Sequence, residues 1–272
     1  QDGASEQLEL LQGLRGAVAA GQLRLHYQPK IDSRSGQVRS VEALLRWQHP
    51  ARGLVGPVQF IPLAERFGLI VGIGAWVIDE ACRQVAQWSA EGRRLRVSIN
   101  LSAYQLRQPD IVERVGAAIH RHGLAADQLV CEITESAAME DTQTTQRVLE
   151  GLAGLGVKLS IDDFGTGYSS LAKLRRMRAH ELKIDREFVA DVARDADARA
   201  VVDAIVHLGH ALGLRVVAEG VETPAQRDAL VALGCDELQG YYFARPLPPE
   251  VLLDDEHEAR RADFSPSVLM EE

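Results

Sequence analysis

Cysteine, aromatic residues and long apolar runs are all scarce in this chain of 272 residues. The three cysteines, Cys82, Cys131 and Cys235, lie far apart and form no CxxC pair, which argues against a disulfide framework or a zinc site. No apolar run reaches the ~20 residues of a membrane span, and no signal-peptide pattern is recognisable. We therefore expect a domain of the reducing cytoplasm. Because the chain begins at Gln1 rather than Met, we expect a piece of a longer protein, whose other parts could attach it to the inner membrane.

A positive net charge is also lacking, since the chain has 30 Lys and Arg residues but 39 Asp and Glu residues, which gives a formal charge of −9. A broad nucleic-acid-binding face needs clustered Lys and Arg, so a nucleic-acid polymer is excluded as the expected partner. A small phosphorylated ligand stays compatible with this charge, because metal ions and a few local cations can offset an acidic background.

Strand-like and helix-like stretches alternate along nearly the whole chain. The expected strands are residues 23–32, 38–47, 96–102, 129–135, 157–164, 181–185, 214–220 and 236–244. Eight strands alternating with helices predict an α/β protein, a (β/α)8 TIM-barrel-like fold rather than an open doubly wound sheet. The first two strands, joined by a short turn, predict an antiparallel hairpin and therefore a modified start.

Three segments of the chain are expected to differ in role. Residues 1–20 have helical periodicity and are expected to form a helix or linker from a longer parent. Residues 21–250 would form the barrel, and residues 251–272 a C-terminal helix or tail.

The stretch VKLSIDDFGTGYSS (157–170) ends an apolar strand on two adjacent carboxylates, Asp162 and Asp163. Turn chemistry explains one such residue, because Asp and Gly favour strand exits and Asp can cap the next helix. Two like charges raise each other's pKa unless a cation lies between them. Taken alone, the stretch leaves both interpretations open.

A polar residue recurs within or just after most expected strands. These residues are Glu42, Asn100, Glu132, Asp162 with Asp163, Lys183, Glu219 and Gln239. In a parallel barrel the carboxyl ends of the strands meet at one mouth, which is where the active sites of such barrels lie. Five carboxylates in one mouth are costly without cations, and Mg²⁺ or Mn²⁺ prefer oxygen ligands of this kind. Two metal ions would suit a phosphoryl displacement, with Lys183 orienting water or stabilising the transition state.

Seven motifs occur in one order between residues 20 and 250, namely EALLRW, INLS, CEITE, IDDFGTGYSSL, LKID, AEGVET and LQGYYFARPLP. Together they resemble the EAL-domain family. The resemblance implies a barrel phosphodiesterase, active on the second messenger cyclic di-GMP, that forms linear pGpG with two Mg²⁺ or Mn²⁺ ions, while Ca²⁺ is expected to inhibit. It also implies a homodimer through the DDFGTG loop, and a sensory or cyclase domain upstream.

The resemblance also implies roles for individual residues. Glu42, Asn100, Glu132 and Asp162 are the expected ligands of a first metal ion, and Asp162, Asp163 and Glu219 those of a second. The expected catalytic residues are Lys183, Glu219 and Glu42. The expected substrate contacts are Gln28, Leu45, Arg46 and Gln239. Glu135 is expected to hold the DDFGTG loop, with Asp185 and Glu222 as supporting groups.

Two other functions stay open. The first is a non-catalytic cyclic di-GMP receptor, because many members of the family lose metal ligands and act by binding alone; this chain keeps the ligand positions. The second is a metal-dependent barrel isomerase or lyase, since carboxylates at barrel mouths serve that chemistry too. Residue by residue, Lys183 could instead pair structurally with Asp185 or Glu219, and Glu219 and Glu222 could cap the helix that follows them.

Overall fold

The computed structural model describes residues 2–140, 142–167 and 171–252. One nine-stranded sheet runs in the order β1-β9-β8-β7-β6-β5-β4-β2-β3, and an additional pairing of β1 with β2 closes it. The strands are β1 (Leu23–Asp32), β2 (Val38–His49), β3 (Gly53–Val55), β4 (Arg96–Asn100), β5 (Leu129–Thr134), β6 (Lys158–Phe164), β7 (Glu181–Ile184), β8 (Arg215–Ala218) and β9 (Glu237–Leu238). Eight of them form the closed barrel, and the short β3 extends from β2.

The start of the barrel departs from a regular β-α-β order. Strand β1 runs antiparallel to both of its neighbours, β2 and β9, whereas the pairs from β2–β4 onward around the barrel to β8–β9 are parallel. This confirms the expected α/β barrel with an antiparallel hairpin at its beginning.

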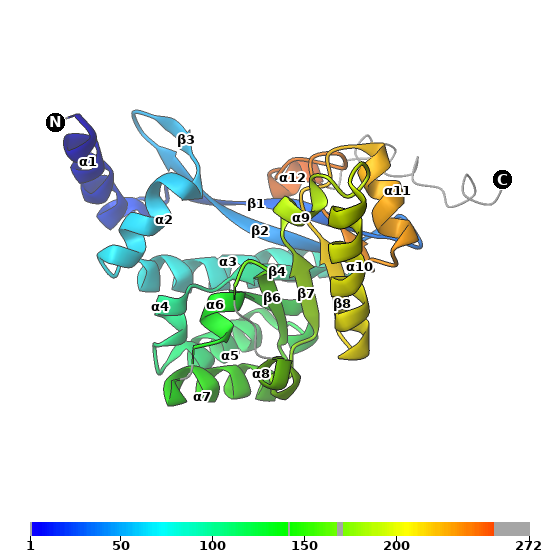
Figure 1. Ribbon diagram of the computed structural model, residues 1–272. Coiled ribbons are helices and arrows are strands. Elements are labelled where there is room, and N and C mark those ends of the chain that lie inside the picture. Colours follow the sequence, from blue (N-terminus) through cyan, green and yellow to red (C-terminus); the bar gives the residue numbers. More distant parts are fainter. Residues whose placement is uncertain (1, 141, 168–170, 253–272) are drawn as a thin grey trace.

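Helices cover the outside of the barrel (Figure 1). They are α1 (Asp2–Ala17), α2 (Pro57–Arg66), α3 (Ile70–Ala90), α4 (Ala103–Leu106), α5 (Ile111–His122), α6 (Glu135–Ala138), α7 (Gln143–Gly154), α8 (Leu171–Arg176), α9 (Arg186–Val189), α10 (Ala196–Ala211), α11 (Pro224–Ala232) and α12 (Pro249–Leu252), with a 3-10 turn at Ala126–Gln128. Helix α1 lies beside α2 at the far end of the hairpin. Its residues Leu10 and Leu14 are buried in the same core as the barrel strands.

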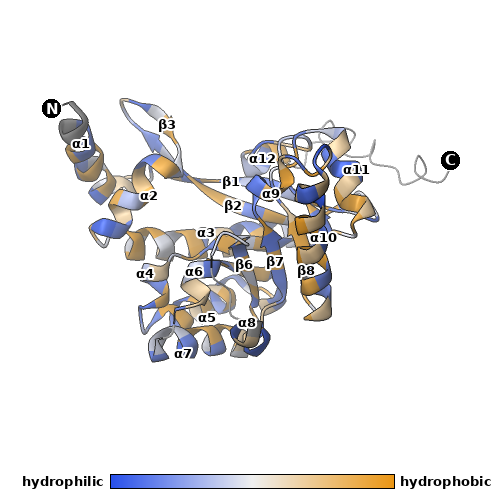
Figure 2. Cartoon of the chain, viewed as in Figure 1, coloured by the Kyte–Doolittle hydropathy of each residue, from blue (hydrophilic) through white to orange (hydrophobic). Residues whose placement is uncertain are grey.

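Alternation along the strands separates an apolar shell from a polar interior. On β4, Val97 and Ile99 join the core beneath the helices, whereas Ser98 between them makes a hydrogen bond inside the barrel. The same alternation on β5 turns Cys131 and Ile133 outward, into the apolar core. Figure 2 shows that apolar residues recur along both the strands and the helices around them. The interior is therefore held by hydrogen bonds and ion pairs, not by a packed apolar core alone.

Two strands differ most from the expectation. The last strand is only Glu237–Leu238, so the expected range 236–244 is wrong. The chain turns at Gly240, which lies against the backbone of Val221 so closely that a Cβ atom there would be 2.1 Å from the Val221 carbonyl oxygen. Strand β3, which pairs with the end of β2, was not expected.

The expected C-terminal helix or tail, residues 251–272, coincides with the end of α12 at Leu252 and otherwise lies outside the described residues. Across the part of the chain that the structure describes, no helix combines the length and the apolar character needed to cross a membrane.

Candidate active site

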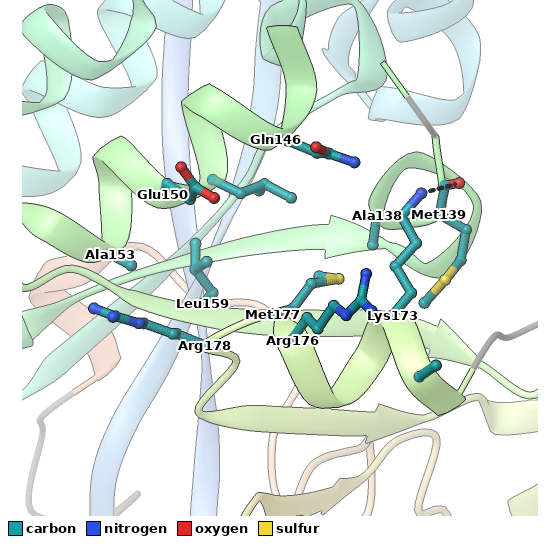
Figure 3. A pocket seen from close by; sticks show the side chains of 12 residues that line it. Ala138, Met139, Gln146, Glu150, Ala153, Leu159, Lys173, Arg176, Met177 and Arg178 are labelled. Atoms are coloured by element: carbon teal, nitrogen blue, oxygen red, sulfur yellow. Dashed lines mark hydrogen bonds between the residues drawn. The ribbon is translucent and has the colours of Figure 1, made fainter. Parts of the chain in front are cut away.

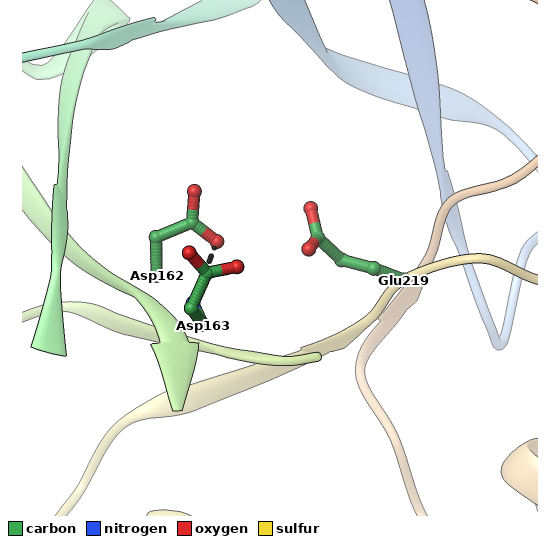
Figure 4. Close-up of side chains that lie close together, drawn as sticks. All are labelled: Asp162, Asp163 and Glu219. Carbon is green, nitrogen blue, oxygen red and sulfur yellow. Dashed lines mark hydrogen bonds between the residues drawn. The ribbon is translucent and has the colours of Figure 1, made fainter. Parts of the chain in front are cut away.

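The carboxyl ends of the strands bring the acidic residues into one mouth. Figure 4 shows Asp162 and Asp163, at the end of β6, facing Glu219, which follows β8 directly. Oxygen atoms of these three carboxylates all lie within 4.8 Å of one another. The close approach of three acids is the arrangement in which a divalent cation can be held.

Lys183, from β7, lies at the centre of the mouth and is 1% exposed. Its Nζ atom is 2.7 Å from Glu132 Oε2 and 2.7 Å from Glu219 Oε1. Asp162 Oδ1 follows at 3.2 Å and Glu42 Oε2 at 3.4 Å. The structure thus gathers four expected metal ligands around one ammonium group, and we call these four carboxylates the acidic ring.

A set of amides completes the ring on the side of Glu42. Asn100 donates through Nδ2 to Glu42 Oε1 at 2.8 Å, which leaves its amide oxygen for a cation. Gln239 donates through Nε2 to Glu42 Oε2 at 2.7 Å and to Gln28 Oε1 at 3.1 Å. Among the described residues, the buried Gln239 Oε1 atom has no hydrogen-bond partner. Two expected substrate contacts therefore lie directly beside an expected metal ligand.

Burial and mutual repulsion shift the protonation of the mouth. Burial raises the pKa of Glu219 to about 8, although Lys183 opposes the shift. Burial and the neighbouring Asp162 raise the pKa of Asp163 to about 6. Burial and Glu132 also raise the pKa of Glu42. One lysine therefore does not neutralise the mouth, and further positive charge would be favourable there.

The loop that follows β6 is fixed by a buried glutamate. Glu135 Oε2 accepts hydrogen bonds from the backbone N–H groups of Gly165 at 2.9 Å and Gly167 at 3.2 Å. Of the non-glycine residues described, only Asp163 has a positive φ, of 53°. Such a backbone is strained for most side chains and persists when its surroundings hold it, so Glu135 lies where it can stabilise the conformation of Asp163.

The remaining expected residues lie farther from the ring. Asp185 accepts from the backbone of Glu187 at the start of α9 and interacts with Asp163. Leu45 is buried, and Arg46 is half-buried, donating to the Leu45 carbonyl oxygen at 2.8 Å. Glu222 has an exposed side chain, while its backbone N–H belongs to the turn before α11. No described contact brings Glu222 into the ring.

The site and the fold agree with what comparison with known proteins finds. The sequence profile of the EAL domain matches residues 11–246. The chain belongs to the EAL domain family. Its sequence is 53% identical over 251 residues to the bifunctional diguanylate cyclase/cyclic di-GMP phosphodiesterase MucR of Pseudomonas aeruginosa, covering 92% of this chain and 37% of MucR. It is 44% identical over 266 residues to the cyclic di-GMP phosphodiesterase NbdA of the same species, covering 97% and 34%.

A solved structure gives the same fold. The phosphodiesterase of PaMucR in complex with c-di-GMP superposes with a TM-score of 0.87 and 52% identity, over 90% of this chain and all of that one. This EAL domain spans only about a third of the length of the two curated relatives.

The oxygen donors of this EAL domain fit a hard divalent cation. Carboxylates and one amide oxygen suit Mg²⁺ or Mn²⁺, whereas a thiolate or imidazole set would suit softer metals. The mouth carries an excess of negative charge despite Lys183, which is the electrostatic condition for holding such ions. The residues present therefore fit the family's metal dependence.

One buried residue of the EAL domain was not singled out by the sequence. Lys30, on β1, is fully buried and reaches Glu132 from the side opposite Lys183. Burial alone would raise the pKa of Glu132, but the two lysines outweigh it and lower the pKa to about 2. Strand alternation puts Lys30 on the same face as Gln28, and that was the available signal.

A cavity of about 940 Å³ lies elsewhere, on the flank of the barrel between α7, α8 and β6 (Figure 3). Lys173 lines it and donates to the Met139 carbonyl oxygen at 2.7 Å. None of the residues that line it belongs to the expected site. The candidate active site is the mouth, not this cavity.

Proposed function

We propose that this EAL domain hydrolyses cyclic di-GMP to linear pGpG, with Mg²⁺ or Mn²⁺ held in the mouth. The observation that carries the proposal is the convergence of Glu42, Glu132, Asp162 and Glu219 on one buried point, with Asp163 beside them. The names of the relatives support the substrate, since two are cyclic di-GMP phosphodiesterases and a solved relative is a c-di-GMP complex.

In this proposal the acidic groups hold two ions. Glu42, Asn100, Glu132 and Asp162 bind the first, and Asp162, Asp163 and Glu219 the second. When bound, such ions supply a water nucleophile of lowered pKa and neutralise charge on the phosphodiester. The oxygen of water bonds to one phosphorus atom, and the bond between that phosphorus and the 3′ oxygen breaks. The products are a 5′-phosphate and a 3′-hydroxyl, which takes up a proton.

The other residues bind and orient. Lys183 would lie beside the reacting phosphate, where its ammonium group could orient water or offset developing charge. Gln239 Oε1, buried and unpartnered among the described residues, is available to accept a hydrogen bond from the substrate. Arg46 would contact a phosphate, with Gln28 and Leu45 lining the site. Glu135 would hold the loop, and Asp185 and Glu222 would act as supporting groups.

Turnover with purified protein tests the function. Incubation of cyclic di-GMP with Mg²⁺ or Mn²⁺ should give pGpG on chromatography, and EDTA or Ca²⁺ should suppress it. Asp162→Asn and Glu42→Gln should each lower the rate by more than about 100-fold, since even groups that only orient a ligand cost about 10–100-fold. Glu113→Gln, at an exposed position on α5, is the control and should keep the wild-type rate. Tight binding of cyclic di-GMP without product would instead support the non-catalytic receptor.

The setting of the domain is also part of the proposal. Residues 21–250 would form the enzymatic barrel, 1–20 a helix or linker from a longer parent, and 251–272 a C-terminal helix or tail. We infer a cytoplasmic domain that forms a homodimer through the DDFGTG loop and lies downstream of a sensory or cyclase domain. The multidomain relatives and their greater length support this setting. Sedimentation of the domain with and without cyclic di-GMP would test the dimer.

A further inference from the structure

The interior of the barrel holds a second lysine beneath the acidic ring. Lys30 Nζ donates to Glu132 Oε1 at 2.7 Å, to Glu181 Oε1 at 2.9 Å and to Ser98 Oγ at 2.9 Å. An ammonium group has three donors, and these three bonds use them all. All four side chains are buried, so Lys30 is held in one position.

Each carboxylate oxygen of Glu132 therefore pairs with a different lysine. Its Oε1 atom is 2.7 Å from Lys30, and its Oε2 atom is 2.7 Å from Lys183, whose ammonium also contacts the rest of the ring. Lys183 belongs to the mouth, whereas the other partners of Lys30 lie inside the barrel wall. Only Oε2 is thus on the side where the proposed metal ions would be bound.

We propose that Lys30 is a positioning residue that makes Glu132 a one-oxygen ligand and so favours Mg²⁺ or Mn²⁺ over Ca²⁺. The inference rests on the proposed metal site. Mg²⁺ demands near-octahedral geometry at short distances, which single carboxylate oxygens satisfy. Ca²⁺ takes six to eight oxygens and often binds both oxygens of a carboxylate. While Lys30 occupies Oε1, Glu132 cannot offer the second oxygen.

A purely structural role is the competing explanation. Lys30 also neutralises Glu181, which accepts a further hydrogen bond from Ser160 Oγ at 3.0 Å. Lys30 could serve only to balance this buried charge and to link β1 to the other strands. In that case, removing Lys30 together with the charge of Glu181 would restore the wild-type ratio of Ca²⁺ to Mn²⁺ affinity. The double variant Lys30→Met/Glu181→Gln therefore separates the two roles, and it removes the unpaired charge that threatens folding of the single variant.

The ratio of two metal affinities is the readout. Removing the positive charge of Lys30 strengthens the binding of any divalent ion, so the affinity for one metal alone would not separate the effect of charge from that of ligand geometry. The ratio of the Ca²⁺ and Mn²⁺ affinities separates them, because both ions carry the same charge. The metal-stripped protein is titrated calorimetrically with MnCl₂ and with CaCl₂, without substrate. In Lys30→Met and in the double variant, the Ca²⁺ affinity relative to Mn²⁺ should rise by about tenfold or more, the lower end of what groups behind a ligand contribute.

Matched measurements keep the result interpretable. Glu181→Gln alone disturbs the same buried ion pair but leaves Lys30 on Glu132, so its Ca²⁺/Mn²⁺ ratio should equal that of the wild type. Thermal melts verify that each variant is folded. An unchanged ratio in the double variant would overturn the role of Lys30 while leaving the proposed function intact. Failure of the wild type to bind Mn²⁺ would overturn the proposed metal site itself, and the role of Lys30 with it.

Discussion

Replacing Lys183 by Met should convert the domain into one whose stability depends on divalent metal. In the metal-free protein, Lys183 is the cation that contacts all four carboxylates of the acidic ring at 2.7–3.4 Å, and it is 1% exposed. Removing one partner of a buried ion pair costs about 3–5 kcal/mol, because the other charge stays buried without compensation. For a domain of this size that corresponds to a fall in Tm of about 6–10 °C.

Divalent ions should reverse this loss. With Lys183 gone, the ring is more negative and a bound ion supplies the missing positive charge, so Mg²⁺ should raise the Tm of the variant more than that of the wild type. Catalysis should nevertheless be lost, because the ammonium group beside the phosphate is absent. The lost activity would then coexist with strengthened metal binding, which general misfolding does not produce.

Thermal melts followed by circular dichroism, in EDTA and in MgCl₂, measure these effects. Lys158→Met is a suitable control, since Lys158 is a half-buried lysine at the start of β6, the opposite end of the strand from Asp162. Lys158→Met should change the melting temperature in EDTA by no more than a few degrees. It should also leave the increase in melting temperature caused by Mg²⁺ unchanged. If Lys183→Met melted like the wild type in EDTA, or gained no more from Mg²⁺, the electrostatic description of the mouth would be refuted.

Three further outcomes follow from the site. Glu135→Ala removes two charge-assisted hydrogen bonds to an exposed loop and should lower the free energy of unfolding in urea by about 2–4 kcal/mol. Amide hydrogen exchange at residues 165–167 should also accelerate, and unchanged exchange would contradict the role of Glu135 in holding the loop. Both Asp163→Asn and Asp163→Gly remove a charge that is unfavourable in the metal-free mouth, but only Asp163→Gly also relaxes the positive φ, so it should be more stable than Asp163→Asn by about 1 kcal/mol; both should abolish turnover. Glu219 and Asp163 have pKa values raised to about 8 and about 6 from ordinary values of 4.5 and 3.8, so the folded metal-free protein binds protons that the unfolded chain releases. Its stability in EDTA should therefore fall as pH rises from about 5 to about 8, while Mn²⁺ affinity rises because fewer protons must be displaced. A stability and a Mn²⁺ affinity that do not change over this range would show that these groups are ionised throughout.

The strands with clean alternation were predictable from the sequence. Residues 23–32 were expected, and the structure has Leu23–Asp32, because apolar and polar residues alternate along this strand. Residues 129–135 were also expected, and the structure has Leu129–Thr134, a mostly apolar run that includes the buried Glu132. Residues 236–244 were expected as a strand because their aromatic run has strand propensity, but tertiary packing of Gly240 against Val221 turns the chain early. Strand β3 has three residues, which is too short for a periodic signal.

The site was predictable where its residues end strands. Closure of a barrel brings such ends together, and the structure places Asp162, Lys183 and Glu219 in contact. The polar interior below them was not predictable in the same way. Alternation puts Lys30 on the same face as Gln28 but does not indicate that the lysine is fully buried, since unpaired lysines are seldom buried. Only its partners, from strands distant in sequence, make that burial favourable.

Calorimetric titration of the metal-stripped domain with Mn²⁺ tests most directly whether the mouth is a two-metal centre. The wild type should bind two ions per chain, and Asp163→Asn, which alters only the expected second site, should bind one. Absence of saturable binding by the wild type, or the same number of ions in both proteins, would contradict a two-metal phosphodiesterase site at the barrel mouth.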